Sequence, residues 1–429
     1  MGIAHDLSTI TWSSSNNGGG TYLPAILIGP DGLWLEAKPP LTAIHAVNSA
    51  RPANSAERRC PSRTMNKGGQ VTLPRAFRIR EEMTALEHDG RLSRSPGCET
   101  RRAISERVKM RALFLGTPSR FSARALWAWL SAGNEVCEFW YAHNTRTGAW
   151  RWDRRLGLVA PSWSVAAALR RFRVASRAVA PLRRSPGLWN IAKDLGADVL
   201  ISAEFPYVVP SAILDRFGPQ AVNLHPALLP DYRGPYPVAG MLFHDEVQRC
   251  GGVTLHVMLP ELDTGPIIAQ RPVTWPAKGG FRQWELQLGQ AAGSLVAIDL
   301  HEYLGGHLTA KPQLGEGRYC RRLTPEQLLL HAGLTAHRTR HLLDTIGALL
   351  PLQVDVGQRL LKVAAFEQIV GPRTFASPDV GPRRIIVDVA DARVSLYRWQ
   401  PWTARLRRWE MLRVFASAPP ICFEARRVA

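Results

Sequence analysis

The sequence predicts an α/β fold: an open, doubly wound domain with a mostly parallel sheet, followed by a small C-terminal β-barrel domain. Three observations predict it. Short apolar strands alternate with helical stretches from residue 110 onward, which is typical of strand–helix–strand units. Polar residues follow several of these strands, as expected at the carboxyl edge of a parallel sheet. Beyond about residue 313 the pattern changes to helices and then alternating strands.

The first strand–helix–strand unit begins directly after Met110. Residues 111–118, RALFLGTP, are an apolar run that enters a Gly-Thr-Pro turn. The next stretch, FSARALWAWLSAG, has helical spacing, and Gly133 is well placed to end the helix. A second apolar strand, EVCEFWYA, occupies residues 135–142. Such a unit within about 30 residues indicates parallel strands.

Four further strands are predicted in the same domain. Each is an apolar run of strand length, and they cover residues 198–203, 221–225, 251–259 and 266–273. Helical stretches intervene, which favours a Rossmann-like arrangement over residues 110–313. The turn after the first strand is not G-x-G-x-x-G, so the sequence does not predict dinucleotide binding.

The predicted C-terminal domain covers residues 314–429. A Thr-Pro-x-Gln capping box at residues 324–327 predicts a helix from TPEQLLLHAG, and TAHRTRHLLDTIG predicts a second helix that ends at Gly347. The alternation of RRIIVDVADARVSLYRWQ (383–400) predicts antiparallel strands. We therefore expect helices followed by an OB-like barrel.

Residues 1–109 differ from the rest of the chain. They are rich in turn-forming residues and show no sustained helical or strand period. We expect a disordered extension, or a segment that is not translated because synthesis begins at Met110. One island, residues 66–82, resembles the start of the swapped-hairpin DNA-binding domain of antitoxins, with an extra glycine and without that family's downstream strand pair.

Composition and charge limit the classes of protein. The chain has 429 residues, of which 45% are hydrophobic, and no apolar run of membrane-spanning length. It also lacks a secretory signal pattern, and its six cysteines show no C-x-x-C spacing, so we expect a cytoplasmic protein without a disulfide scaffold or zinc knuckle. The net charge is +19, and arginine is concentrated at residues 151–184 and 373–427. Such a field attracts polyanions such as nucleic acid, although solvated arginines would give the same composition.

Three polar side chains at strand ends form the candidate catalytic group. Asn223 and His225 lie at the end of a predicted strand, and alternation places both on one face. Asp263 follows the next strand, on a turn made sharp by Gly265 and Pro266. An amide, an imidazole and a carboxylate together suit acyl transfer through a tetrahedral intermediate. Taken singly, these residues could be a turn asparagine, a buried core histidine and a turn former.

The same segments resemble a known family. NLHPALLPDYRGPYPV and GGVTLHVMLPELDTGPII are similar to the folate-dependent formyltransferases, and MRALFLGTP is similar to the opening of the methionyl-tRNA formyltransferases among them. The resemblance implies transfer of a formyl group from 10-formyltetrahydrofolate to an amine, without a metal. It assigns catalysis to Asn223, His225 and Asp263. It assigns folate contacts to Ala227, Leu228, Leu229 and Pro230, with alanine where serine is usual, and Gly251 stands where threonine is common.

The resemblance also implies a mechanism. Asn223 and the imidazolium of His225 are expected to stabilise the oxyanion. Asp263 is expected to raise the pKa of His225 by its opposite charge and to help move a proton to the leaving nitrogen.

The acceptor amine is the open question. Similarity to the methionyl-tRNA enzymes implies initiator methionyl-tRNA as partner in translation initiation. Their basic loop after the second strand corresponds here to residues 144–162, so Arg151 and Arg154 are candidate substrate-binding residues, and Arg233 could meet an anionic substrate or only solvent. The alternatives are an amino-sugar nucleotide or other small amine as acceptor, or a nucleic-acid binder without catalysis.

Other aromatic and imidazole side chains have weaker interpretations. His244 and His256 lack the H-E-x-x-H spacing of a zinc site, and His256 lies in an apolar strand, so a structural role is expected. Trp399 and Trp402 could stack on nucleotides, but barrel core and rim positions are the plainer interpretation.

Overall fold

A computed structural model describes residues 109–357 and 359–418. The predicted N-terminal extension, up to residue 108 and including the island 66–82, lies outside the described residues, so these expectations stay untested. No helix within the described ranges is both long and apolar enough to cross a bilayer.

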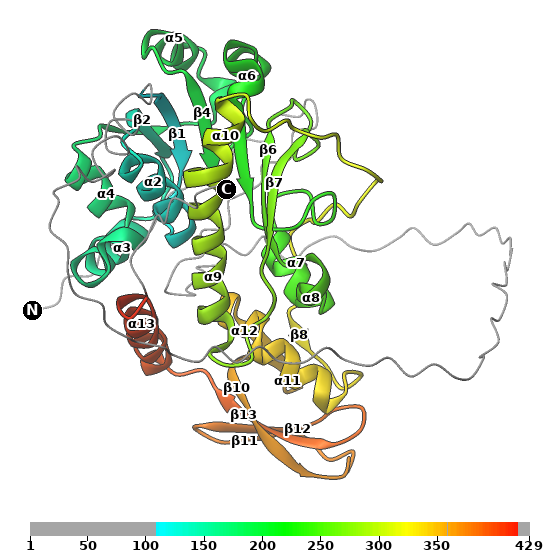
Figure 1. Ribbon diagram of the computed structural model, residues 1–429. Helices are drawn as coiled ribbons and strands as arrows, with labels where there is room; N and C mark the ends of the chain where they lie inside the picture. The colour runs from blue at the N-terminus through cyan, green and yellow to red at the C-terminus, as the bar shows by residue number, and fades with distance from the viewer. Residues whose placement is uncertain (1–108, 358, 419–429) are drawn as a thin grey trace, which may run out of the picture. The chain divides into compact units, whose positions relative to one another are not determined.

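A seven-stranded sheet carries the first part of the fold, with strand order β3-β2-β1-β4-β5-β6-β7 (Figure 1). Its strands are β1 (Arg111–Gly116), β2 (Glu135–Ala142), β3 (Ser176–Val179), β4 (Val199–Ala203), β5 (Ala221–His225), β6 (Gly252–Val257) and β7 (Ile267–Pro272). β1 to β5 pair in parallel, and β6 and β7 join through antiparallel ladders. The predicted mostly parallel sheet is confirmed, with β3 as an additional short strand.

Helices cover both faces of this sheet (Figure 1). They are α2 (Arg120–Ser131), α3 (Thr147–Val159), α4 (Val165–Phe172), α5 (Gly187–Asp194), α6 (Ser211–Phe217), α7 (Pro237–His244), α8 (Val247–Cys250), α9 (Gly280–Ser294) and α10 (Leu300–Leu304). α2 and α9 pack against each other and on one face. Leu113, Leu115 and Leu200 pack on the other face with the apolar side chains of α5 and α6. Because both faces are buried, the central strands are continuously apolar.

The second part of the fold is a small six-stranded sheet, ordered β11-β12-β13-β10-β9-β8. Its strands are β8 (Leu329–Leu330), β9 (Leu352–Asp355), β10 (Leu360–Gly371), β11 (Asp379–Val380), β12 (Arg384–Asp388) and β13 (Arg393–Arg398). β12 and β13 pair antiparallel, as predicted from their alternation. The β-rich C-terminal part is thus confirmed. Its helices are α11 (Ala336–Asp344), α12 (Ile346–Leu349) and α13 (Pro401–Ala416).

One helix prediction in this part was wrong, and a second helix formed but ended at another residue than predicted. The capping-box bonds at residues 324–327 do form, with the Thr324 N–H donating to Gln327 Oε1 (2.8 Å), but only a turn follows. Leu329 and Leu330 instead enter β8 and pair with β9, so the strand ladder replaces the helix. The second helix does not end at Gly347 either, because α11 stops at Asp344 and α12 continues through Gly347 to Leu349.

Helix α13 was not predicted, and it packs on the first part of the fold (Figure 1). Met411 and Phe415 are almost fully buried with Leu156 of α3 and with Trp163. The rings of Phe415 and Trp163 meet edge to face at 4.9 Å. Trp402, expected in a barrel, lies on α13 and is 59% exposed. Trp399 precedes the helix and stacks with the guanidinium of Arg407.

Candidate active site

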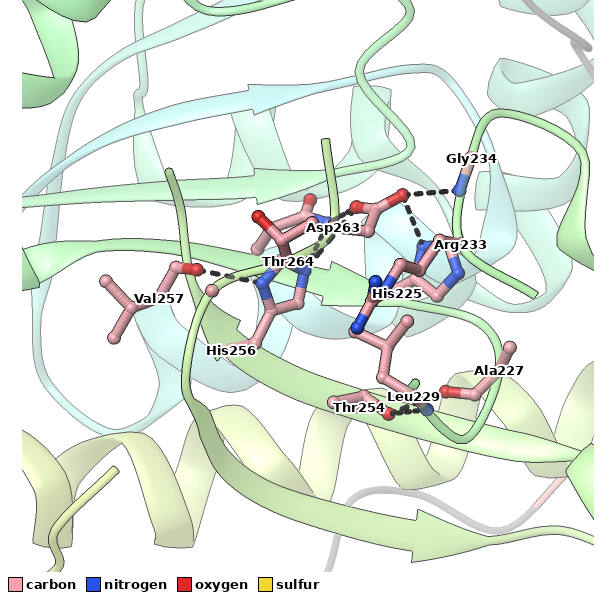
Figure 2. Close-up of polar contacts among 12 residues, drawn as sticks. His225, Ala227, Leu229, Arg233, Gly234, Thr254, His256, Val257, Asp263 and Thr264 are labelled. Atoms are coloured by element: carbon pink, nitrogen blue, oxygen red, sulfur yellow. Dashed lines mark hydrogen bonds and ion pairs between the residues drawn. The ribbon is translucent and has the colours of Figure 1, made fainter. Parts of the chain in front are cut away.

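The three predicted catalytic side chains meet on one wall of a cavity of about 190 Å³. Asn223 and His225 extend from the carboxyl end of β5, and Asp263 follows β6. Asn223 Nδ2 lies 3.5 Å from Asp263 Oδ1. His225 Nδ1 lies 3.5 Å from Asp263 Oδ2, and Figure 2 shows these two side chains facing each other. The amide, imidazole and carboxylate meet as the sequence predicted, but β6 runs antiparallel to β5, so the segment after β6 has to bring Asp263 back to the two β5 side chains.

His256 is a fourth member of this group, although the sequence indicated only a structural role. The antiparallel ladder between β5 and β6 pairs His256 directly with Asn223. His256 Nδ1 lies 2.9 Å from the carbonyl of Val257, which can only accept, so Nδ1 carries the proton. The lone pair of Nε2 then accepts from Asn223 Nδ2 at 3.1 Å (Figure 2 shows the His256 ring beside Asp263). His256 thus fixes the orientation of the Asn223 amide.

The Asp263 turn is held by three hydrogen bonds, which come from two residues. Its Oδ2 accepts the backbone N–H of Gly234 at 2.8 Å (Figure 2). The side-chain amide of Gln313 donates to the carbonyls of Asp263 (2.9 Å) and Gly265 (2.8 Å). Asp263 itself has φ +56°, a left-handed conformation that costs about 1 kcal/mol for a non-glycine residue. A Cβ on Gly265 would lie 1.8 Å from the carbonyl of Val257, so only glycine fits there.

Arg233 belongs to this support and does not border the cavity. Its Nε and Nη2 donate to Gln313 Oε1 at 3.2 and 2.9 Å. Whether Arg233 meets an anionic substrate or only solvent stays a prediction, and two of its guanidinium donors are engaged by Gln313. We call Arg233 and Gln313 together the Asp263 clamp. Sequence reasoning missed Gln313, which lies 50 positions from Asp263.

The protonation of His225 differs from the expectation. Its Nε2 lies 2.8 Å from the carbonyl of Tyr232, which can only accept, so Nε2 carries a proton. Burial lowers the pKa of His225, and this outweighs the raising effect of the Asp263 charge, with the His256 ring lowering it further. Asp263 therefore raises the pKa of His225 as predicted, but the net pKa is lowered, so the resting imidazole is neutral at pH 7 instead of the expected imidazolium, and its Nδ1 faces Asp263.

Asp263 is ionised in the same setting. Burial alone would raise its pKa, but the interactions with His225 and His256 and the N–H of Gly234 together lower it to about 2. The carboxylate is thus ready to stabilise a proton that arrives on His225.

The remaining walls of the cavity are largely apolar. They come from the segments after β4 and β6, from residues 234–239 at the start of α7, and from one residue of α12. Their apolar and aromatic side chains include Phe205, Tyr207, Val208, Val209, Tyr236, Val238, Met258, Leu259, Leu262 and Leu349. The polar side chains of Ser202 and Glu204 also border it.

The predicted folate-contacting residues Ala227, Leu228, Leu229 and Pro230 do not border this cavity, and their backbone groups are used inside the protein. Thr254 Oγ1 donates to the Ala227 carbonyl (2.6 Å) and accepts from the Leu229 N–H (3.1 Å) (Figure 2). The Leu228 N–H donates to the Cys250 carbonyl at 2.9 Å. This loop thus lies outside the cavity lining, whereas residues 204–209 are part of it.

The other candidate residues lie away from the cavity. Arg151 and Arg154 are exposed on α3, and Arg154 borders a separate cavity with Trp150 and Arg170. His244 lies beside the phenol of Tyr232, 3.2 Å from its oxygen. In the part of the chain that the structure describes, no cluster of three His, Cys, Asp or Glu side chains could hold a metal ion.

Comparison with known proteins finds a similarity that covers the candidate active site. Residues 177–277 match the family model described as formyl transferase, and they include β5, β6 and the Asp263 turn. This segment is therefore similar in sequence to formyl transferases.

Individual relatives share a larger segment. A methionyl-tRNA formyltransferase of Chloroflexus aurantiacus is 32% identical over 204 residues, which are 48% of this chain and 62% of that protein. The methionyl-tRNA formyltransferase of Coprothermobacter proteolyticus is 31% identical over 172 residues, 39% of this chain and 54% of that protein. The chain thus spans less than two thirds of the length of these relatives.

A solved N-formyltransferase from Helicobacter canadensis, in complex with folinic acid and dTDP-3-aminofucose, aligns with 14% identity and a TM-score of 0.49. The alignment covers 68% of this chain and all of that one.

Proposed function

We propose that this chain transfers a formyl group from 10-formyltetrahydrofolate to the amino group of methionyl-tRNA. The observation that carries the proposal is the meeting of Asn223, His225 and Asp263 on one wall of a cavity whose other walls are apolar. A formyl group on a folate nitrogen is already an activated acyl group, so the protein has to bind it, stabilise an oxyanion and move one proton.

The cavity suits the donor. Aromatic and aliphatic side chains at residues 205–209 and 258–262 can enclose a planar heteroaromatic ring by burial of apolar surface. The polar wall lies beside them, so the formyl group of a donor bound there lies near the catalytic side chains.

The catalytic steps follow from the hydrogen bonds of the free protein. The neutral amine attacks the formyl carbon and gives an oxyanion and a charged nitrogen. The long 3.5 Å contact from Asn223 Nδ2 to Asp263 is the weakest bond of that amide, so this N–H can turn to the oxyanion. His225 Nδ1 takes the proton of the charged nitrogen, Asp263 stabilises the resulting imidazolium, and His225 delivers the proton to the leaving folate nitrogen.

The acceptor is argued from surface charge and from the relatives. Eight of the nine arginines between residues 151 and 184 are exposed, on α3, α4 and the segments beside them. The ninth, Arg177, pairs with Glu138 at 2.9 Å. A basic surface of this kind binds a phosphate backbone through counterion release, and relatives with 31–32% identity are methionyl-tRNA formyltransferases.

The test uses the purified full chain with 10-formyltetrahydrofolate and charged initiator tRNA, scored for formylmethionine. Asn223→Ala and Asp263→Ala should each lower the rate by about 100-fold or more. Near-normal rates in both variants would remove these roles. A small amine acceptor, such as an amino-sugar nucleotide, is distinguished by a shallow dependence of KM on salt, because a tRNA acceptor loses affinity steeply.

A further inference from the structure

Glu204 is a carboxyl group in the catalytic cavity that the mechanism above does not use. It follows β4 directly and borders the same cavity as Asn223, His225 and Asp263. Its backbone has φ +54°, the left-handed region that glycine prefers. A glutamate there costs about 1 kcal/mol relative to glycine, and such outliers concentrate at functional sites.

The neighbours of Glu204 hold its side chain without neutralising it. Ser119 Oγ donates to the Glu204 carboxylate, while the same oxygen accepts the N–H of Ser122 and caps α2. The adjacent Arg120 is paired with Glu285, which also binds Arg282. The nearby cation is therefore already matched by another acid.

These surroundings set the acidity of Glu204. Burial raises its pKa to about 7, against the lowering effects of the Ser119 bond and the Arg120 charge, while the Glu285 charge raises it. Near neutral pH the group therefore exists in both protonation states.

The position of Glu204 relative to Asn223 leaves room for an amine. In the parallel ladder Ser202 pairs with Asn223, and Glu204 lies two residues further along. From the usual strand spacing and rise, the Glu204 Cα lies about 8 Å from that of Asn223. Glu204 is an acidic residue at the cavity, and none of the described residues that border the cavity with it is a lysine or arginine.

We propose that Glu204 binds the ammonium group of the acceptor and takes its proton, so that the amine can attack. The step is R–NH₃⁺ plus Glu204 carboxylate giving R–NH₂ plus Glu204 carboxylic acid, and solvent removes the proton before the next turnover. This inference rests on the proposed formyl transfer, and it adds a cation-binding subsite with a proton acceptor to that reaction.

The subsite selects a class of amine. An α-amino group has a pKa of about 7.7–8.0, so proton transfer to Glu204 is uphill by about one pKa unit. An alkyl amine with a pKa of about 10.4 would face more than three units. The subsite therefore favours an aminoacyl group over a lysine-like amine.

The experiment compares Glu204→Gln with the full wild-type chain. The amide keeps an acceptor for Ser119 but loses the charge and the basic oxygen. We expect kcat/KM for the acceptor at pH 7 to fall about 100-fold. The rise of kcat/KM with pH near pH 7, which reports deprotonation of Glu204 in the wild type, should disappear from the pH profile. The KM for 10-formyltetrahydrofolate should stay within about twofold of wild type. The matched control Ser119→Ala removes the hydrogen bond and keeps the carboxylate, so its kcat/KM should still rise with pH.

A second measurement needs no variant. The wild-type chain should bind methionine methyl ester about tenfold more tightly than the neutral isostere with a hydroxyl in place of the amino group. An unchanged pH profile in Glu204→Gln, or equal binding of the two esters, overturns the role of Glu204 while wild-type formyl transfer stands. A wild-type chain that formylates no amine overturns the proposed function itself.

Discussion

Replacing Gln313 by methionine should slow formyl transfer strongly, because Gln313 holds the turn that carries Asp263. Its amide donates to the carbonyls of Asp263 and Gly265 at 2.9 and 2.8 Å. Each such bond contributes about 0.5–1.5 kcal/mol net, so the turn loses about 1–3 kcal/mol. The left-handed backbone of Asp263 can then relax and withdraw its carboxylate from His225. If about 2.7 kcal/mol of this lost stabilisation raises the free energy of the transition state, kcat/KM falls about 100-fold.

The assay is kcat/KM for formyl transfer across pH 6–9, with thermal unfolding measured on the same samples. Gln368→Met is the control, because Gln368 is exposed on β10. Gln313→Glu should also be slow, since a carboxylate still pairs with Arg233 but cannot donate to the two carbonyls. A Gln313→Met enzyme with kcat/KM within about threefold of wild type would refute the positioning argument, even if its unfolding temperature fell.

Two further outcomes follow from burial and charge. The folded pKa of Asp263 is about 2, below the unfolded value of about 3.9, so its contribution of about 2 kcal/mol to the free energy of unfolding is present above pH 4 and is lost as pH falls toward 2. In urea unfolding, the difference in stability between pH 5 and pH 3 should be smaller for Asp263→Asn than for wild type. An equal difference in the two proteins would contradict this prediction. Phe415→Ala should lower the free energy of unfolding by about 3 kcal/mol, because the ring is 1% exposed and meets Trp163 edge to face. The control Trp409→Ala, at a site 59% exposed, should change the free energy of unfolding by less than about 0.5 kcal/mol. Equal losses in the two variants would show that α13 is not anchored through Phe415.

The strand ends could be predicted from the sequence because their signal is local. Apolar runs give the strands, and Asn223, His225 and Asp263 directly follow or end them. Parallel topology places the ends of β4 and β5 at one edge of the sheet. Asp263 follows β6, which runs antiparallel to β5, and it reaches the site through the segment after that strand. The resemblance to formyltransferases rests on these same local motifs.

The missed features depend on contacts between distant segments. His256 joins the site only because β6 pairs antiparallel with β5, and an apolar strand does not show its pairing direction. The pKa of His225 falls because the folded protein excludes water from it, which the nearby Asp263 alone did not suggest. At residues 324–327 the capping bonds formed as predicted, yet pairing of Leu329 with β9 prevented the helix. Local propensity is decided by such tertiary partners.

The packing of α13 on the first part of the fold also bears on how the chain is synthesised. Arg120 and Met411, which contact each other in the folded protein, are 291 positions apart. The apolar surface of Leu156 and Trp163 is therefore uncovered until α13 has been synthesised. At a ribosomal pace of about 5–20 residues per second, that surface stays open to other proteins for roughly 12–50 seconds after it emerges. A nascent chain stalled before residue 401 would therefore expose an adhesive patch beside an otherwise complete sheet.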